Sequence, residues 1–308
     1  MGLPVLIDTD MGADDALAVG LALCAASLRV EALVSVAGNV DLNQATTNTG
    51  RLLAALDPPN WPIVGKGLSQ TEPDLIDARS VFGDDGFGQA DLPRSENLKT
   101  KKHRAIYRDL LKRHQGQLHI VAIGPLTNVA DVLAEQADLL RRAARLTIMG
   151  GAIWVRGNVD GLAEFNFYRD PAAAHAVLSS GLPITVIPLD LTRQVVFDES
   201  HLAHLEGSGT RVGQFLGQVL PYAMQHGREL PRGQMLIHDA LAIGSILWPQ
   251  LFLKTELALE IETTGKARGR SRPAVGERGK RVSVLTGVRT VDFLENMLEQ
   301  FCQETFVV

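Results

Sequence analysis

The chain has 308 residues, of which 45% are apolar and 21% charged, and its formal net charge is -5 at pH 7. A chain of this size buries enough apolar surface to fold without disulfide bonds or a structural metal, which excludes intrinsic disorder and disulfide-dependent miniproteins. Its weakly acidic charge gives no electrostatic reason to expect a nucleic-acid or membrane partner, so small molecules are the expected ligands. Cys24 and Cys302 form no disulfide or zinc pattern.

No targeting or membrane signal is visible in the sequence. The N-terminus lacks the basic region of a signal peptide and runs directly into a strand-like segment. The longest apolar stretch, residues 16–26, is much shorter than the roughly 20 residues that a bilayer span needs. We therefore expect a cytoplasmic protein in which residues 1–308 form a single domain.

Short apolar runs alternate with helical patterns along the first two thirds of the chain, as in parallel strands joined by crossover helices. Strands are expected at residues 5–7, 30–36, 118–123, 146–149 and 184–187, and helices at residues 15–27, 45–56, 126–140 and 171–178. The strands are nearly all apolar, which indicates a sheet covered on both faces. The prediction is an α/β fold with an open, mostly parallel sheet, helices on both faces and a Rossmann-like core.

The C-terminal third is less regular. It predicts a helix in the 210s and 220s, a half-exposed strand at residues 257–262, and helices at residues 239–247 and 290–301. The stretch from Lys266 to Arg281 contains seven basic residues and one acidic residue, with Gly and Pro interspersed. Because it lacks aromatic platforms, we expect a solvated loop or hairpin tip rather than a phosphate site.

Four aspartates, Asp8, Asp10, Asp14 and Asp15, lie between the first expected strand and the first helix. Open parallel sheets bind ligands at this position, beyond the carboxyl ends of their strands. A helix N-cap explains one aspartate but not four. Crowded carboxylates oppose folding unless a cation neutralises them, so the cluster predicts a hard metal ion. Neither an EF-hand nor a P-loop pattern fits the surrounding residues.

Further polar segments follow other expected strands. Gly38-Asn39 ends the second strand, and Thr127 or Asn128 in Gly124-Pro125-Leu126-Thr127-Asn128 is more simply explained as a helix cap. Asn158 and the run Glu164-Phe165-Asn166 combine amides, a carboxylate and an aromatic ring, which suits recognition of hydroxyl groups. For His238-Asp239, a helix cap and a functional pair are equally consistent with the sequence.

Taken in this order, these motifs resemble those of the inosine-uridine preferring nucleoside hydrolase family. The resemblance extends from Asp8 to at least Asp239, and the aspartate cluster is its most specific part. Two positions depart from the family pattern. Met11 replaces the usual proline, which predicts a looser turn, and Phe82 stands where several members carry a histidine implicated in base recognition.

The resemblance implies an enzyme of purine or pyrimidine salvage that hydrolyses the N-glycosidic bond of ribonucleosides and acts as a homodimer or homotetramer. It implies Ca²⁺ bound by Asp10, Asp15, Asp239 and the carbonyl oxygen of Ile123, with Asp10 also the general base. His238 would be the general acid, its charged form supported by Asp239. The residues expected to contact the sugar or wall the pocket are Asp14, Asn39, Asn158, Glu164, Phe165, Asn166 and Trp154. Base contacts are expected from loops near Asp84 and from residues 222–228.

Two other functions stay open at this stage. The D-x-D pattern also fits a metal-dependent phosphohydrolase with Asp8 or Asp10 as nucleophile, although such phosphatases usually carry Thr or Val where Gly12 stands. A protein that binds Ca²⁺ and a nucleoside or ribose without turnover has the same ligand requirements. Release of phosphate or of free base distinguishes these activities.

Overall fold

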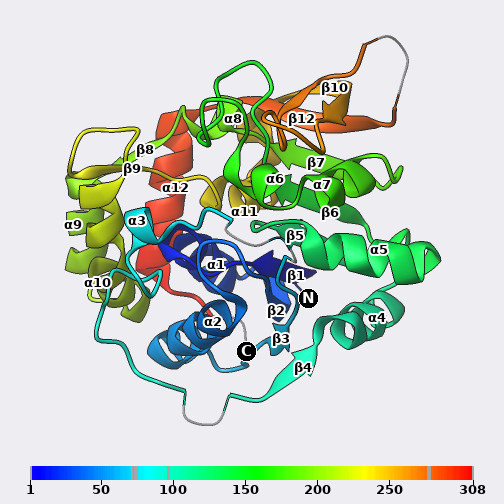
Figure 1. Ribbon diagram of the computed structural model, residues 1–308. Helices are drawn as coiled ribbons and strands as arrows, with labels where there is room; N and C mark the ends of the chain where they lie inside the picture. The colour runs from blue at the N-terminus through cyan, green and yellow to red at the C-terminus, as the bar shows by residue number, and fades with distance from the viewer. Residues whose placement is uncertain (1, 71, 73–74, 96–97, 276–278, 307–308) are drawn as a thin grey trace.

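A ten-stranded sheet crosses the molecule in the order β11-β10-β12-β7-β6-β5-β1-β2-β3-β4 (Figure 1). This computed structural model describes every residue except 1, 71, 73–74, 96–97, 276–278 and 307–308. The strands from β7 to β4, and β12 against β7, pair in parallel, whereas β10 is antiparallel to both β11 and β12. The strands of the sheet are β1 (Leu3–Thr9), β2 (Leu28–Ser35), β3 (Ile63–Lys66), β4 (Thr100–Lys102), β5 (His119–Ala122), β6 (Arg145–Met149), β7 (Ile184–Ile187), β10 (Phe252–Ile261), β11 (Ser271–Pro273) and β12 (Arg281–Val288).

Helices cover both faces of this sheet, as the all-apolar strands predict (Figure 1). One face carries α1 (Ala13–Cys24), α2 (Leu42–Leu56), α10 (Arg211–His226), α11 (Ala240–Leu247) and α12 (Thr290–Gln303). The other face carries α4 (His103–Arg113), α5 (Thr127–Leu140) and α7 (Pro171–Leu178). The remaining elements are α3 (Arg79–Phe82), α6 (Phe165–Arg169), α8 (Leu189–Thr192), α9 (Glu199–Gly207), a 3₁₀ turn (Pro249–Leu251) and the separate ribbon of β8 (Val196–Asp198) and β9 (Gln234–Leu236).

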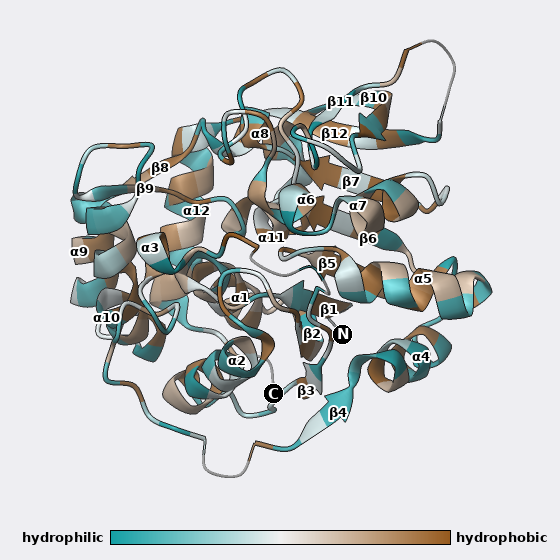
Figure 2. Cartoon of the chain, viewed as in Figure 1, coloured by the Kyte–Doolittle hydropathy of each residue, from teal (hydrophilic) through white to brown (hydrophobic). Residues whose placement is uncertain are grey.

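Strand β1 shows why the sheet needs two layers of helices. Val5 and Ile7 belong to the apolar cluster on the α1 face, whereas Leu6 belongs to the cluster on the α5 face. All three side chains are fully buried, because successive residues of a strand point to opposite sides. The central strands are mostly hydrophobic in Figure 2, whereas the edge strand β4 is hydrophilic and exposed. The predicted fold class is therefore confirmed.

Several elements were not predicted from the sequence. Strands β3 and β4 and helix α4 lie in a stretch for which no element was expected, and β12 was missed although it pairs with both β7 and β10. The strand expected at residues 257–262 is the end of β10, whose first half is mostly exposed and has no apolar pattern. The stretch from Lys266 to Arg281 connects β10 to β12 and contains β11; residues 276–278 lie outside the described residues. None of the described helices is long and apolar enough to cross a bilayer.

The contact between α11 and α12 offers a test of core packing. A β-carbon at Gly244 would lie 2.2 Å from Cε2 of the buried Phe293. We expect Gly244→Ala to lower the free energy of unfolding by about 1–3 kcal/mol, because overpacking outweighs the helix propensity of alanine. Urea denaturation measures this change. Gly207→Ala is the control, since nothing lies within 4 Å of its new methyl group; equal effects of the two substitutions would contradict the packing argument.

Candidate active site

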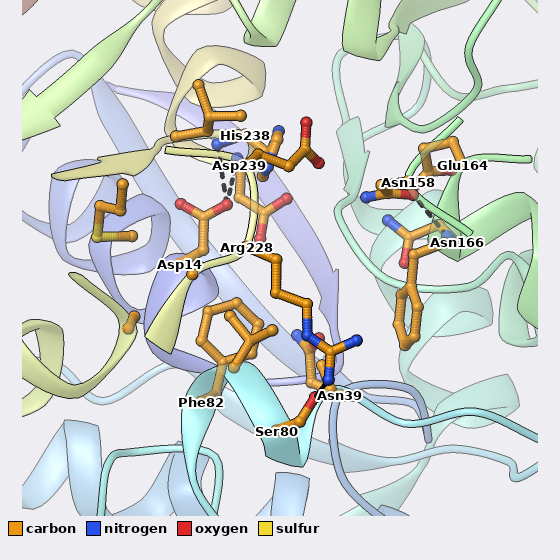
Figure 3. A pocket seen from close by; sticks show the side chains of 18 of the residues that line it. Asp14, Asn39, Ser80, Phe82, Asn158, Glu164, Asn166, Arg228, His238 and Asp239 are labelled. Atoms are coloured by element: carbon orange, nitrogen blue, oxygen red, sulfur yellow. Dashed lines mark hydrogen bonds between the residues drawn. The ribbon is translucent and has the colours of Figure 1, made fainter. Parts of the chain in front are cut away.

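A pocket of about 240 Å³ opens beyond the carboxyl ends of the parallel strands (Figure 3). Its floor comes from the loops after β1, β2, β5 and β6, and its mouth from α3 and from the segment between α10 and α11. The predicted site residues that line it are Asp10, Asp14, Asn39, Ile123, Asn158, Glu164, Phe165, Asn166, His238 and Asp239. Asp15 lies behind this wall and contacts the pocket residue Asn39. The structure thus brings the predicted residues together, while their roles stay predictions.

The aspartate loop is held in place by hydrogen bonds to its own carboxylates. Asp15 is in the first turn of α1, where Oδ1 accepts from the Thr9 hydroxyl (2.6 Å) and Oδ2 from the Gly12 amide (3.0 Å). The Asn39 side-chain amide donates to both Asp15 Oδ2 (2.8 Å) and Asp10 Oδ1 (3.1 Å). The Asn39 backbone N–H also donates to Asp10 Oδ2 (2.7 Å). The loop after β2 therefore orients the carboxylates that follow β1.

Asp14 connects the first loop with a segment more than 200 residues away. Its Oδ2 accepts the backbone N–H groups of His238 (2.9 Å) and Asp239 (3.2 Å), as the dashed lines in Figure 3 indicate. Its Oδ1 is buried and has no hydrogen-bond partner among the described residues. The bond to Asp14 keeps the buried carboxylate of Asp239 beside the aspartate cluster. Although Asp239 precedes α11, its side chain does not cap that helix.

Burial and mutual repulsion make this cluster electrostatically costly. Burial raises the pKa of Asp14 to about 7 and raises the pKa values of Asp10 and Asp239 well above their ordinary range. For Asp239, the charges of Asp14, Asp15 and Asp10 add to the effect of burial. Burial also raises the pKa of Asp15. Carboxylates in this state require protons or a cation to offset their charge.

The atoms that could bind a metal ion at this site are oxygens, which hard cations prefer. They are carboxylate oxygens and the Ile123 carbonyl, and the unpartnered Asp14 Oδ1 leaves one buried acceptor unsatisfied. In the part of the chain that the structure describes, no three His, Cys, Asp or Glu side chains already converge as a ligand set. The Asp10 and Asp15 oxygens are instead engaged by Asn39, Thr9 and Gly12. The residues therefore fit such an ion in chemistry and burial.

The opposite wall of the pocket is built around the start of α6. Glu164 caps this helix: its carboxylate accepts the N–H groups of Asn166 (2.7 Å), Phe167 (3.1 Å) and Gly151 (2.9 Å). The Asn166 side-chain amide donates to the carbonyls of Ile123 (2.9 Å) and Met149 (3.1 Å). Because its N–H groups are used in this way, Asn166 keeps its side-chain oxygen as an acceptor for a ligand.

His238 differs from the expectation of a charged acid. It is partly buried in the pocket wall, and its Nδ1 pairs with the Thr192 hydroxyl at 2.7 Å. Desolvation lowers its pKa to about 4, so the imidazole is neutral at pH 7. The premise that Asp239 supports the charged form was wrong, because Asp239 is not among the groups that shift this pKa and its own pKa is raised.

Three further expectations need correction. Trp154 does not wall the pocket; its side chain is 56% exposed and its backbone N–H donates to Asp190. Asn128 does not cap α5 but forms a buried link, donating to both oxygens of Asp8 (3.1 Å each) and accepting the Leu68 N–H (2.8 Å). Asp8 is also bound by a tyrosine hydroxyl and lies outside the pocket, which removes it as a candidate nucleophile.

The turn at Met11 is not loose. Met11 is fully buried with a positive φ of 37°, a conformation that the ring of proline cannot adopt. Its N–H donates to the Thr9 hydroxyl (3.1 Å), and its carbonyl accepts the Asn48 side-chain amide (3.1 Å). These two bonds hold the loop in a conformation different from that of a proline-containing turn.

The pocket mouth contains Ser80, which the sequence analysis did not single out, beside Phe82 and Arg228, which it placed in regions linked to base recognition. Ser80 and Phe82 come from the short helix α3, and Arg228 follows α10 (Figure 3). Of the regions expected to contact a base, Arg228 lines the pocket, whereas Asp84 and Tyr222 do not. No local signal marked Ser80, because an isolated serine in a four-residue helix has no distinctive pattern.

Comparison with known proteins shows the family to which the chain belongs. The chain matches the inosine-uridine preferring nucleoside hydrolase family over residues 5–295. It is 34% identical over 272 residues to the pyrimidine-specific ribonucleoside hydrolase RihA of Klebsiella pneumoniae and 35% identical over 269 residues to that of Citrobacter koseri, with 86% of each chain covered. The fold is similar to that of a purine-preferring ribonucleoside hydrolase from Gardnerella vaginalis, with a TM-score of 0.92, 26% identity and coverage of 99% of this chain and 100% of the other.

A plant nucleoside hydrolase is also similar, with a TM-score of 0.91, 27% identity and coverage of 98% of this chain and 99% of that one. The chain therefore belongs to the inosine-uridine preferring nucleoside hydrolase family. It is an enzyme that hydrolyses the N-glycosidic bond of ribonucleosides, as the resemblance implied. The phosphohydrolase and the non-catalytic binding protein are thereby set aside.

Gly38 tests whether the position of Asp10 matters for activity. A β-carbon at Gly38 would lie 1.9 Å from Asp10 Oδ2, so Gly38→Ala must displace this carboxylate. We expect a roughly 100-fold lower kcat, since displacement of a reacting group by about 1 Å has an effect of this order. Steady-state kinetics and thermal unfolding measure activity and folding separately. A folded Gly38→Ala enzyme with normal kcat would show that the observed position of Asp10 is unimportant.

Proposed function

We propose that the pocket hydrolyses ribonucleosides with Ca²⁺ as cofactor and Asp10 as general base. Asp10, Asp15, Asp239 and the Ile123 carbonyl would hold the ion. When bound, Ca²⁺ would orient two ribose hydroxyls and acidify the attacking water. The observation that carries the proposal is the buried carboxylate cluster, formed from segments 225 residues apart, at the ligand-binding edge of the sheet.

Asp10 accepts a proton from the water that attacks C1′ of the ribose in this proposal. Its carboxylate lies in the pocket wall and is oriented by two hydrogen bonds from Asn39. As the glycosidic bond breaks, positive charge develops on the sugar ring. The carboxylates oriented in advance stabilise this charge more strongly than they stabilise the neutral ground state.

The ribose is proposed to lie between the aspartate loop and the start of α6. Both walls carry oxygen acceptors, including the unpartnered Asp14 Oδ1 and the side-chain oxygen of Asn166. The exposed Asn158 offers an amide at the same wall. The residues assigned to substrate binding are Asp14, Asn39, Asn158, Glu164, Phe165 and Asn166.

His238 is proposed to assist the leaving base as a neutral hydrogen-bond donor. When the Thr192 hydroxyl donates to Nδ1, the ring proton is on Nε2, which has no partner among the described side chains. An imidazole with a low pKa donates a hydrogen bond without first needing to be charged. This proposal replaces the charged acid that the sequence suggested.

The similar enzymes differ in the base that they prefer. The similar RihA enzymes are named pyrimidine-specific, whereas the similar Gardnerella vaginalis enzyme is named purine-preferring. We propose ribonucleosides as the substrate class, in purine or pyrimidine salvage in the cytoplasm, by a homodimer or homotetramer without a nucleic-acid partner. The net charge of -5 supports the last point. Light scattering measures the oligomeric state.

Metal removal and the loss of Asp10 test the central proposal. Treatment with a chelator should abolish base release, and added Ca²⁺ should restore it.

Asp10→Ala should lower kcat by at least roughly 10²-fold, because general base assistance is lost. Ultraviolet absorbance follows base release, and circular dichroism checks the fold. Asp138→Ala is the control, since that side chain is 98% exposed on α5; near-normal turnover of Asp10→Ala would remove Asp10 from the mechanism.

His238→Ala separates leaving-group assistance from substrate positioning. The variant should lose roughly 10²-fold or more on nucleosides with poor leaving groups, whereas p-nitrophenyl riboside should be affected far less. The p-nitrophenolate group departs with little assistance, so the difference isolates the role of the imidazole. Similar losses of kcat/KM on both substrates would instead assign His238 to ligand positioning.

A further inference from the structure

Arg169, the last residue of α6, is a buried cation behind the pocket wall. It is only 8% exposed and is not among the residues that line the pocket. Its Nη1 donates to the backbone carbonyl of Ile76 (2.7 Å), and its Nη2 donates to the side-chain oxygen of Gln70 (2.8 Å). Its Nε has no partner among the described residues. The guanidinium therefore directs its hydrogen bonds to the segment that follows β3.

The first of these contacts supports the loop after β2 through Gln70. The side-chain amide nitrogen of Gln70 donates to the Ala37 carbonyl (2.8 Å) and to the Thr127 hydroxyl (3.1 Å). A guanidinium has no acceptor, so it must bind the oxygen of the Gln70 amide, and the amide nitrogen then faces Ala37. Arg169 therefore determines which way the Gln70 side chain points.

The second contact supports the same loop through the backbone. Ile76 and Ala78 line the pocket, and the Ala78 N–H donates to the carbonyl of Asn39 (3.1 Å). The loop after β2 is thus held at two carbonyls, those of Ala37 and Asn39. From this position Asn39 donates its backbone N–H and its side-chain amide to the Asp10 carboxylate.

We infer that Arg169 is a positioning residue that acts through Asn39 to orient the Asp10 carboxylate. This inference rests on the proposed function, in which Asp10 is the general base. Desolvation lowers the pKa of Arg169, and among the charges that oppose this shift that of Asp10 has the largest effect. The guanidinium therefore lies within electrostatic range of Asp10, although two loops separate it from the ligand.

Arg169→Lys tests the two hydrogen bonds while it keeps the positive charge. The ammonium of lysine lacks the planar fork, so it cannot hold Gln70 and the Ile76 carbonyl in the same geometry. We expect kcat to fall by about 10-fold, because a small displacement of a reacting carboxylate slows the chemical step. The activated substrate p-nitrophenyl riboside keeps slow variants measurable, and thermal unfolding reports their stability.

Arg145→Lys is the matched control. Arg145 starts β6, donates to the Thr185 hydroxyl (2.9 Å) and is not among the pocket residues. The same substitution at this partly buried arginine should leave kcat unchanged.

A double-mutant cycle with Asn39→Ala separates positioning from a general loss of structure. Asn39→Ala removes the side-chain link to Asp10, so adding Arg169→Lys should then lower kcat by no more than about 3-fold. If Arg169→Lys does not fold, Gln70→Ala gives the same comparison, because it removes only the Ala37 contact at a half-buried residue.

Equal fold-losses of kcat with and without Asn39 would overturn the inference and leave Arg169 a purely structural residue. An unchanged kcat in folded Arg169→Lys would overturn it as well. The proposed function fails by a different result, normal turnover of Asp10→Ala. An impaired Asp10→Ala together with equal losses in the cycle would therefore reject only the role of Arg169.

Discussion

The mutual repulsion of buried carboxylates is the constraint on which the rest of the structure depends. Asp10, Asp14, Asp15 and Asp239 are all nearly inaccessible to solvent, and each has a raised pKa. Such a cluster does not stabilise the fold by itself, because unpaired buried charge is costly. The surrounding backbone and amide donors hold it in place. This cost is offset when the cluster binds a cation or a positively charged transition state. A glycosidase forms such a transition state, because positive charge develops on the sugar as the glycosidic bond breaks.

The support for this cluster is a second, deeper set of polar contacts. Asp8 is fully buried and is bound by the Tyr107 hydroxyl (2.8 Å) and by Asn128, which also holds the Leu68 amide. These contacts link β1 to α4, to α5 and to the segment after β3. Gly38 leaves the space that Asp10 occupies. The pocket is thus preorganised by buried hydrogen bonds around its carboxylates, whereas its mouth is formed by shorter and more exposed segments.

The sequence predicted those parts of the structure that have a local physical signature. Apolar runs identified the central strands, because burial on both faces demands them. The aspartate loop was predicted as a site, since four clustered carboxylates have no other simple explanation. Strand β4 and the first half of β10 were missed, because exposed edge strands lack an apolar pattern. The charge state of His238 was also mispredicted, since desolvation depends on neighbours that only the folded chain supplies.

The sequence by itself determined the alternation of central strands and helices, the family, and the aspartate cluster that follows the first strand. Only the tertiary structure decided that Asp14 accepts the backbone N–H of Asp239, 225 residues away, and that Arg228 reaches Ser80 across 148 residues. The physical reason is that a hydrogen bond between distant segments imposes no periodicity on either one. Its partners are chosen by how the sheet is ordered and how the helices pack, and these follow from the burial of the whole chain.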